Sequence, residues 1–176
     1  MPERLVRSQA VFSGRVIKVQ VDEVALAGGR HSQREVVVHP GAVVMLAEDG
    51  EGRILFVSQY RHATGKTLLE LPAGTLEPGE APEAAAAREL GEETGYEPGG
   101  LERLGGFYSA PGFCTEYLHA FLCTRLRPSQ HRPDFDEEIA PVRLTLAEAL
   151  ARAHTGEIQD AKTLATLLLY QLRTAN

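Results

Sequence analysis

Three glutamates on one face of a predicted helix are the residues of this sequence best suited to chemistry. Glu89, Glu92 and Glu93 stand at positions i, i+3 and i+4. Because each helical residue advances by about 100°, their carboxylates share an arc of roughly 100°. Like charges at this spacing repel, whereas a hard divalent cation with oxygen ligands would make the cluster favourable. The pattern indicates a metal site; the alternative is a solvated acidic face on which Arg88 pairs with Glu92.

A loop and a helix within residues 71–96 must position these carboxylates. Proline and glycine interrupt residues 72–79, which indicates a loop. Pro82 suits the first turn of a helix, where its missing N–H is not needed, and Gly95 predicts a left-handed residue at the helix end. Glu80 precedes the helix and would join its acidic face if the loop folds back.

The complete spacing of this stretch resembles the Nudix box. Gly74 is followed by five residues, Glu80, seven residues and then the segment RELGEETGY from Arg88 to Tyr96. The family pattern is Gly, five residues, Glu, seven residues, Arg-Glu-aliphatic-any-Glu-Glu-any-Gly-aliphatic. Tyr96 replaces the usual final aliphatic residue, and its ring can fill an apolar slot. Fixed spacing over so many positions rarely arises by chance, so this resemblance is specific.

The resemblance implies an α+β Nudix fold, with mixed β-sheets sandwiched between α-helices, and hydrolysis that depends on a divalent metal. Mg²⁺ is the implied ion, with Mn²⁺ as a substitute. Gly74 would allow a close backbone approach in the loop, and Arg88 would orient the glutamates. The implied metal ligands are the carboxylates of Glu89, Glu92 and Glu93 and the carbonyl of Ala73.

Segments outside the box resemble the ADP-ribose pyrophosphatase branch of the family. They are residues 59–61, 69–74 and 109–113, and the branch marker is a proline 16 residues beyond the final glycine of the box, where Pro111 stands. Arg61 would contact a substrate phosphate and Glu116 the terminal ribose; the alternatives are a surface arginine and a loop carboxylate. The substrate-binding residues that this similarity implies are Arg61, Glu70, Pro111, Gly112, Phe113 and Glu116.

Diphosphate hydrolysis also needs a base that takes a proton from the attacking water. Relatives in this branch place a base or a further metal ligand in a loop after the box, which corresponds here to residues 134–138. Glu137 fits the family spacing best and is the predicted catalytic residue. Phe135 stands where some relatives have a catalytic glutamate, so Asp136 and Glu138 stay as alternatives.

The composition excludes several classes of partner. A chain of 176 residues with 43% apolar and 24% charged residues fits one globular domain. A formal charge of −6 argues against nucleic-acid binding, and an anionic substrate would need metal ions to reverse the charge of the acidic site. No signal peptide or apolar run of about 18 residues occurs, so no membrane partner is expected. Cys114 and Cys123 form no CxxC pattern, and a cytoplasmic location is predicted.

An N-terminal β-hairpin is predicted to precede the Nudix domain. Residues 15–26 alternate between apolar and polar side chains, and residues 33–38 form the returning strand. We therefore expect residues 1–38 to be a hairpin extension and residues 39–176 to be the Nudix hydrolase domain. The hairpin would serve a homodimer interface, because relatives exchange such segments; the alternative is an edge hairpin of the main sheet.

The remaining chain is predicted to form strands and two C-terminal helices. The strands are residues 42–47, 53–60, 67–71, 101–107, 117–125 and 139–144. Thr145 and Glu148 form a capping box for a helix that ends near His154. Strands with interspersed helices indicate an α+β sandwich. Asp160 can cap a second helix, on which a stripe is formed by Leu164, Leu167, Leu168 and Leu172.

The preferred function is metal-dependent hydrolysis of the diphosphate bond of ADP-ribose, which yields AMP and ribose 5-phosphate. The substrate partner would be a small nucleotide sugar. A pyrophosphatase for another nucleoside diphosphate sugar, such as a UDP- or GDP-linked hexose, is the alternative. A catalytically silent Nudix domain that senses a nucleotide is disfavoured, because the box keeps all of its carboxylates.

Overall fold

The chain forms two compact units in the computed structural model, which describes residues 3–129 and 139–174. One unit comprises Met1–Gly41 and Tyr108–Tyr117, and the other comprises Ala42–Phe107 and Leu118–Asn176. The predicted base Glu137 and its alternatives Asp136 and Glu138 lie outside the described residues. Each unit is described by itself below.

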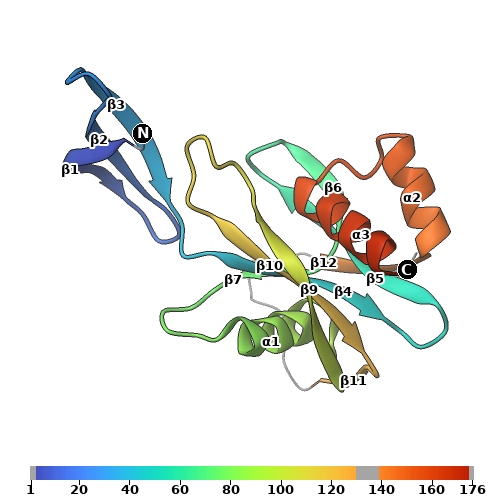
Figure 1. The fold of residues 1–176 in the computed structure, drawn as a ribbon. Coiled ribbons are helices and arrows are strands. Elements are labelled where there is room, and N and C mark those ends of the chain that lie inside the picture. Colours follow the sequence, from blue (N-terminus) through green and yellow to red (C-terminus); the bar gives the residue numbers. More distant parts are fainter. Residues whose placement is uncertain (1–2, 130–138, 175–176) are drawn as a thin grey trace. The chain divides into compact units, whose positions relative to one another are not determined.

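The larger unit is built on a mixed sheet of seven strands (Figure 1). Its central path is β12-β5-β4-β10-β9, while β6 pairs with β5 and β7 pairs with β4. β4 and β10 are parallel, and β4 pairs antiparallel with β5 and β7. The strands are β4 (Ala42–Glu48), β5 (Arg53–Arg61), β6 (Lys66–Glu70), β7 (Ala73–Thr75), β9 (Gly100–Tyr108), β10 (Tyr117–Thr124) and β12 (Ile139–Thr145). A separate two-stranded ladder joins β8 (Tyr96–Glu97) to β11 (Arg127–Pro128).

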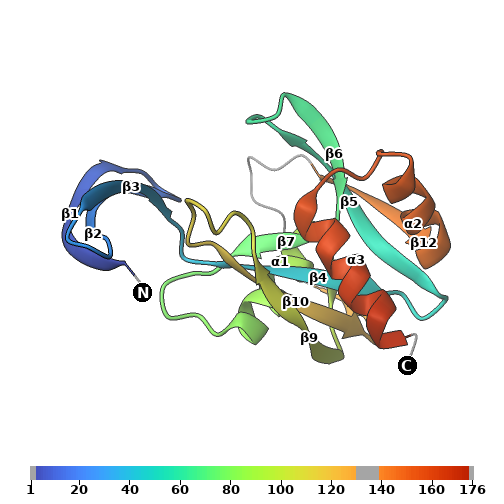
Figure 2. The ribbon, with the colours of Figure 1, turned by 45° about the horizontal axis from the view of Figure 1, so that its top comes forward.

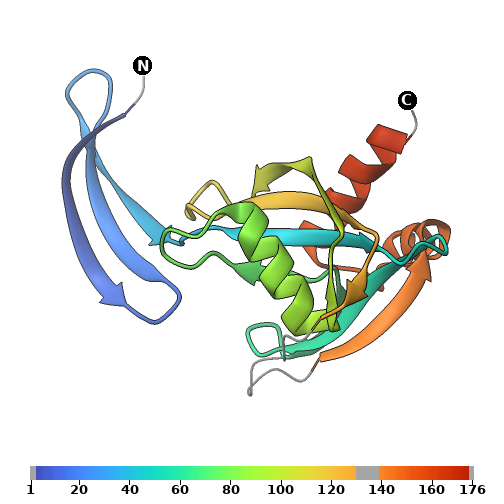
Figure 3. The same cartoon turned by 90° about the horizontal axis from the view of Figure 1, so that it is seen from below.

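Helices cover both faces of this sheet. They are α1 (Pro82–Thr94), α2 (Leu146–His154) and α3 (Ala161–Thr174). The buried strand β4 sends Met45 into a core with Leu90 of α1, and sends Leu46 into a second core with Leu167 of α3. This alternation follows from the period of two in a strand. Figures 1 and 3 show α1 on one face and α3 on the other, which confirms the predicted α+β sandwich.

The helix ends follow the local signals of the sequence. Gly95 ends α1 with a left-handed φ of 74°, and its N–H donates to the Gly91 carbonyl at 3.0 Å. Thr145 and Glu148 form the predicted capping box of α2. Asp160 Oδ2 accepts a hydrogen bond from Thr163 N at 3.0 Å at the start of α3. None of the described helices is long and apolar enough to cross a bilayer.

The smaller unit contains a three-stranded antiparallel sheet, one strand more than the predicted hairpin (Figure 2). The predicted hairpin corresponds to β2 (Lys18–Ala25) and β3 (His31–Val38), and β1 (Arg4–Ser13) pairs with β2. All residues of β1 are exposed, and its register shifts at two irregularities. Each shift breaks the alternation of apolar and polar side chains, so the periodicity that reveals a strand is lost.

The segment Tyr108–Tyr117 belongs to this smaller unit. Val37 N donates to the Phe113 carbonyl at 2.7 Å, and Thr115 N donates to the Val37 carbonyl at 2.9 Å. The segment that carries the branch-marking proline is therefore attached to the end of β3.

The predicted leucine stripe of α3 differs from the face that is buried. Leu167 is 1% exposed, but Leu164, Leu168 and Leu172 are exposed. Thr163 is fully buried instead, because its hydroxyl donates to Asp160 Oδ2 at 2.7 Å and accepts from Leu71 N at 2.8 Å. These bonds satisfy the hydroxyl inside the protein and fix the rotation of the helix.

Neighbouring leucines of α3 provide a matched test of this rotation. Leu167→Ala should lower the free energy of unfolding by about 2–5 kcal/mol, because it empties a packed site. Leu168→Ala should change it by less than about 0.5 kcal/mol, since this side chain is 55% exposed. Urea denaturation followed by circular dichroism measures both values. Equal losses in the two variants would show that the buried face is assigned incorrectly.

Candidate active site

The acidic face of α1 is held together by the guanidinium of Arg88. Arg88 Nε donates to Glu80 Oε1 at 3.0 Å, and Arg88 Nη1 donates to Glu92 Oε2 at 2.9 Å. Arg88 Nη1 also lies 2.9 Å from Glu89 Oε1. The loop before the helix thus folds back and brings Glu80 to this face. The pairing of Arg88 with Glu92 that was expected of a solvated acidic face is present as well.

The Glu89 carboxylate, in its present position, occupies the space that a side chain at position 74 would need. A Cβ atom built on Gly74 would stand 1.8 Å from Glu89 Cδ. A side chain at position 74 would therefore push the Glu89 carboxylate away, whereas the glycine lets the backbone of β7 pass directly beside it. The side chain of Glu89 is 15% exposed. Gly74 and Glu89, two fixed positions of the box pattern, are therefore in direct contact.

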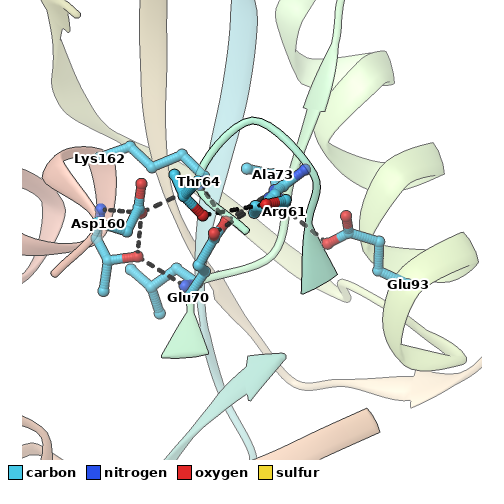
Figure 4. Close-up of polar contacts among 9 residues, drawn as sticks. Arg61, Thr64, Glu70, Ala73, Glu93, Asp160 and Lys162 are labelled. Carbon is cyan, nitrogen blue, oxygen red and sulfur yellow. Dashed lines mark hydrogen bonds and ion pairs between the residues drawn. The ribbon is translucent and has the colours of Figure 1, made fainter. Parts of the chain in front are cut away.

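Glu93 is a buried carboxylate whose side chain points toward the first residue of β7. It is 6% exposed, and its Oε2 accepts a hydrogen bond from Ala73 N at 3.0 Å (Figure 4). A buried carboxylate requires such a donor or a cation to offset the loss of hydration. The structure therefore brings together two predicted metal-binding positions, Ala73 and Glu93.

The donor set of this cluster fits a hard divalent cation. Glu89, Glu92 and Glu93 offer only carboxylate oxygens, the ligands that Mg²⁺ and Mn²⁺ prefer. Among the described residues, no three acidic, histidine or cysteine side chains stand close enough to form a ready-made metal centre. Arg88 and the Ala73 N–H instead hold these carboxylates separately. The chemistry of these carboxylates and the close approach of Gly74 to Glu89 support a metal site on this face of α1.

A second polar cluster surrounds Glu70 at the end of β6 (Figure 4). The Glu70 side chain is 1% exposed and accepts from Arg61 Nε at 3.1 Å and from Arg61 Nη2 at 2.7 Å. Lys162 Nζ donates to the same carboxylate and lies 3.1 Å from Asp160 Oδ2. The structure thus pairs the two predicted substrate-binding residues of this unit, Arg61 and Glu70, with each other.

The electrostatics of both clusters favour the charged forms. The hydrogen bond from Arg88 lowers the pKa of Glu80, and the same contact raises the pKa of Arg88. Burial opposes ionisation of Glu70, but the hydrogen bond from Arg61 and the charge of Lys162 outweigh it and lower the pKa of Glu70. The hydrogen bond to Glu70 raises the pKa of Arg61. These residues are therefore ion pairs at neutral pH.

The other predicted substrate-binding residues belong to the smaller unit. Pro111, Gly112 and Phe113 are exposed, and Glu116 is partly buried. Glu116 Oε1 lies 3.6 Å from His39 Nδ1. All four residues lie on the segment Tyr108–Tyr117, which is hydrogen-bonded to the end of β3.

Sequence reasoning missed the role of Lys162. Asp160 was identified only as a helix cap, and the lysine two residues later had no periodic or motif signal of its own. Its contact with Glu70 joins residues 92 positions apart. Only the tertiary fold could reveal this pair.

Comparison with known proteins assigns the chain to a family. A model described as the NUDIX domain matches residues 38–167. The chain is 41% identical to an ADP-ribose pyrophosphatase of Bacillus subtilis strain 168, over 99% of this chain and 96% of that protein. It is 42% identical to a methanol dehydrogenase activator of Bacillus methanolicus, over 98% and 95% of the two chains. It is 35% identical to a GDP-mannose pyrophosphatase of Citrobacter koseri, over 84% and 80%.

A solved structure supports the fold. The crystal structure of an ADP compounds hydrolase superposes with a TM-score of 0.87 at 22% identity, covering 97% of this chain and 93% of that one. The box from Gly74 to Tyr96 lies inside the matched domain, and its glycine, arginine and glutamates contact one another. On this evidence the chain belongs to the Nudix family.

Proposed function

We propose that this protein is a metal-dependent hydrolase that cleaves the diphosphate bond of ADP-ribose to give AMP and ribose 5-phosphate. The observation that carries the proposal is 41% identity over nearly the whole length to a protein named as an ADP-ribose pyrophosphatase. The complete set of box carboxylates supports a hydrolytic role rather than a silent nucleotide sensor. The proposed substrate is a small molecule. A cytoplasmic location, with no nucleic-acid or membrane partner, stays a prediction from the sequence.

Nudix enzymes typically use divalent metals, and Mg²⁺, with Mn²⁺ as a substitute, is the proposed ion here. Glu89, Glu92 and Glu93 with the Ala73 carbonyl would hold it. A bound divalent cation supplies charge neutralisation at the diphosphate oxygens and favours ionisation of the attacking water. Arg88 keeps two of the glutamates in place by hydrogen bonding and charge pairing.

The chain also supplies groups for the substrate and for proton transfer. Arg61 directs Nε and Nη2 to Glu70 and keeps its side chain 37% exposed, so the third guanidinium nitrogen, Nη1, could bind a phosphate. Glu70 itself is nearly inaccessible, and we propose that it serves the substrate through Arg61. Glu137 is the proposed general base, with Asp136 and Glu138 as alternatives.

Two of the relatives suggest other functions for this protein. The 35% identity to a GDP-mannose pyrophosphatase supports a nucleoside diphosphate hexose as an alternative substrate. The 42% identity to a methanol dehydrogenase activator supports a regulatory role toward a dehydrogenase. A hydrolysis screen of ADP-ribose, ADP-glucose, UDP-glucose and GDP-mannose with Mg²⁺ or Mn²⁺ separates the substrates. Adding the protein to a purified methanol dehydrogenase tests the regulatory role.

Metal dependence predicts a specific loss of activity. EDTA should abolish turnover, and Glu93→Gln should lower kcat by at least ~10²-fold, because a carboxylate that stabilises transition-state charge is lost. Glu83→Gln makes the same chemical change at an exposed position of α1 and should keep full activity. Product analysis by chromatography measures all three. Full turnover in EDTA would exclude a metal mechanism.

Substrate choice tests the branch-marking segment. Proline fixes φ and glycine relaxes it, so Pro111 and Gly112 can define one wall of a substrate site beside Phe113. Glu116 would accept hydrogen bonds from the distal ribose, and a site built to pair hydroxyls discriminates strongly against ligands that leave it unpaired. We expect a higher kcat/KM for ADP-ribose than for ADP-glucose or UDP-glucose.

The matched variants for this test are Glu116→Ala and Glu35→Ala, an exposed position on β3 of the same unit. Glu116→Ala should narrow the preference for ADP-ribose, while Glu35→Ala should preserve it. A wild-type preference for a hexose-linked substrate would replace ADP-ribose with the alternative. An equal loss on all substrates would assign Glu116 a structural role.

A homodimer is proposed on the basis of the N-terminal sheet. Its apolar side chains Leu5, Val6, Val11 and Phe12 are exposed, as expected of a surface that pairs with another chain. Light scattering should give about twice the 19.1 kDa chain mass. Val11→Asp should produce monomers by placing a charge in the interface, whereas Ser8→Asp on the same exposed strand should be milder. An active wild-type monomer at micromolar concentration would refute the dimer.

A further inference from the structure

Lys162 belongs to no part of the proposed reaction, yet it shares a buried carboxylate with the proposed phosphate-binding arginine. Glu70 is 1% exposed; Arg61 donates to both of its carboxylate oxygens, and Lys162 donates to Oε2 (Figure 4). The two cations come from different elements, β5 and α3. One anion thus connects the C-terminal helix to Arg61.

The position of Lys162 is itself determined by α3. Its Nζ lies 3.1 Å from Asp160 Oδ2, the same oxygen that accepts from the backbone and hydroxyl of Thr163. A carboxylate at a helix N-terminus is stabilised by the exposed N–H groups there. The Lys162 side chain is 15% exposed, so it approaches Glu70 from within the protein.

A second cation on Glu70 changes what Arg61 can offer a ligand. Without Lys162, the charges of Arg61, Glu70 and Asp160 would add up to one net negative charge, which would repel a diphosphate. Lys162 contacts both Glu70 and Asp160, so with Lys162 present these four groups are together electrically neutral. A cationic side chain attracts an anion more strongly when the carboxylates around it are neutralised. Lys162 therefore strengthens the attraction of Arg61 for a diphosphate.

We propose that Lys162 is a positioning residue for substrate binding: by sharing Glu70, it fixes the Arg61 guanidinium and leaves its charge available to the diphosphate. This inference rests on the proposed function. Two other roles are distinguishable by experiment. Lys162 could contact the substrate directly, or it could serve only to attach α3 to β6.

The test is a double-mutant cycle between Lys162 and Glu70. Lys162→Met removes the cation, Lys162→Arg keeps it, and Glu70→Gln removes the shared anion while preserving its shape. Lys66→Met is the matched control, because Lys66 is exposed at the first position of β6, whereas Glu70 is buried at the last. Thermal melting verifies that each variant folds. Lys162→Gln gives the same comparison if the methionine variant does not fold.

Two readouts separate positioning from structure. With ADP-ribose and Mg²⁺, Lys162→Met should raise KM about tenfold and change kcat less than about threefold, whereas Lys162→Arg and Lys66→Met should stay within about twofold of wild type. Calorimetric titration with Mg²⁺ and a non-hydrolysable methylene-diphosphonate analogue of ADP-ribose, which cannot turn over, should show the same tenfold change in Kd. In the Glu70→Gln background, Lys162→Met should have less than about a twofold effect, because no buried anion remains for it to share.

The outcomes distinguish the hypotheses. An equal loss of affinity in both Glu70 backgrounds would mean that Lys162 contacts the ligand itself, and a lower melting temperature with unchanged KM and Kd would mean that it is only structural; either result overturns the proposal. If wild type fails to hydrolyse ADP-ribose, the proposed function fails, and the Kd comparison is made with whichever of ADP-ribose, ADP-glucose and GDP-mannose binds most tightly. Absence of binding to all three would also overturn the inference.

Discussion

The arrangement of the acidic helix depends on one guanidinium that several carboxylates share. Glutamates at helical spacing repel each other, and Arg88 offsets this repulsion by contacting Glu80, Glu89 and Glu92. Arg88 Nη2 also donates to the Thr75 carbonyl at 3.3 Å, which attaches α1 to β7. One positive charge among several carboxylates still leaves the cluster negative. An anionic substrate therefore needs additional cations there, which is the physical reason for the proposed metal requirement.

Local rules of the sequence account for the elements that carry this cluster. The box could be located because its residues contact one another through short connections, and the ends of α1 and α2 could be predicted because Gly95 and Thr145 act on adjacent backbone groups. The strand β4 was evident from its continuous apolar run, which is typical of a strand buried on both faces. These features require no knowledge of distant parts of the chain.

Features that arise from distant contacts were not predictable in the same way. The strand β1 was missed because two register irregularities interrupt its side-chain period. The buried face of α3 differed from the leucine stripe because a hydrogen bond from Leu71 to Thr163 made a threonine acceptable inside the protein. Lys162 was missed because its partner Glu70 lies 92 residues away. The sequence shows none of these contacts, since each depends on how separate elements pack.

Residues 70–73 connect the polar cluster around Glu70 to the acidic face of α1. On one side, Glu70 binds Lys162 and Leu71 N donates to Thr163, so α3 holds the start of the segment. On the other side, Ala73 N donates to Glu93, so α1 holds its end. Because these helices lie on opposite faces of one sheet, four consecutive residues transmit the position of each helix to the other. The proposed phosphate-binding Arg61, through Glu70, and Glu93 of the box are thus held by the same stretch of backbone.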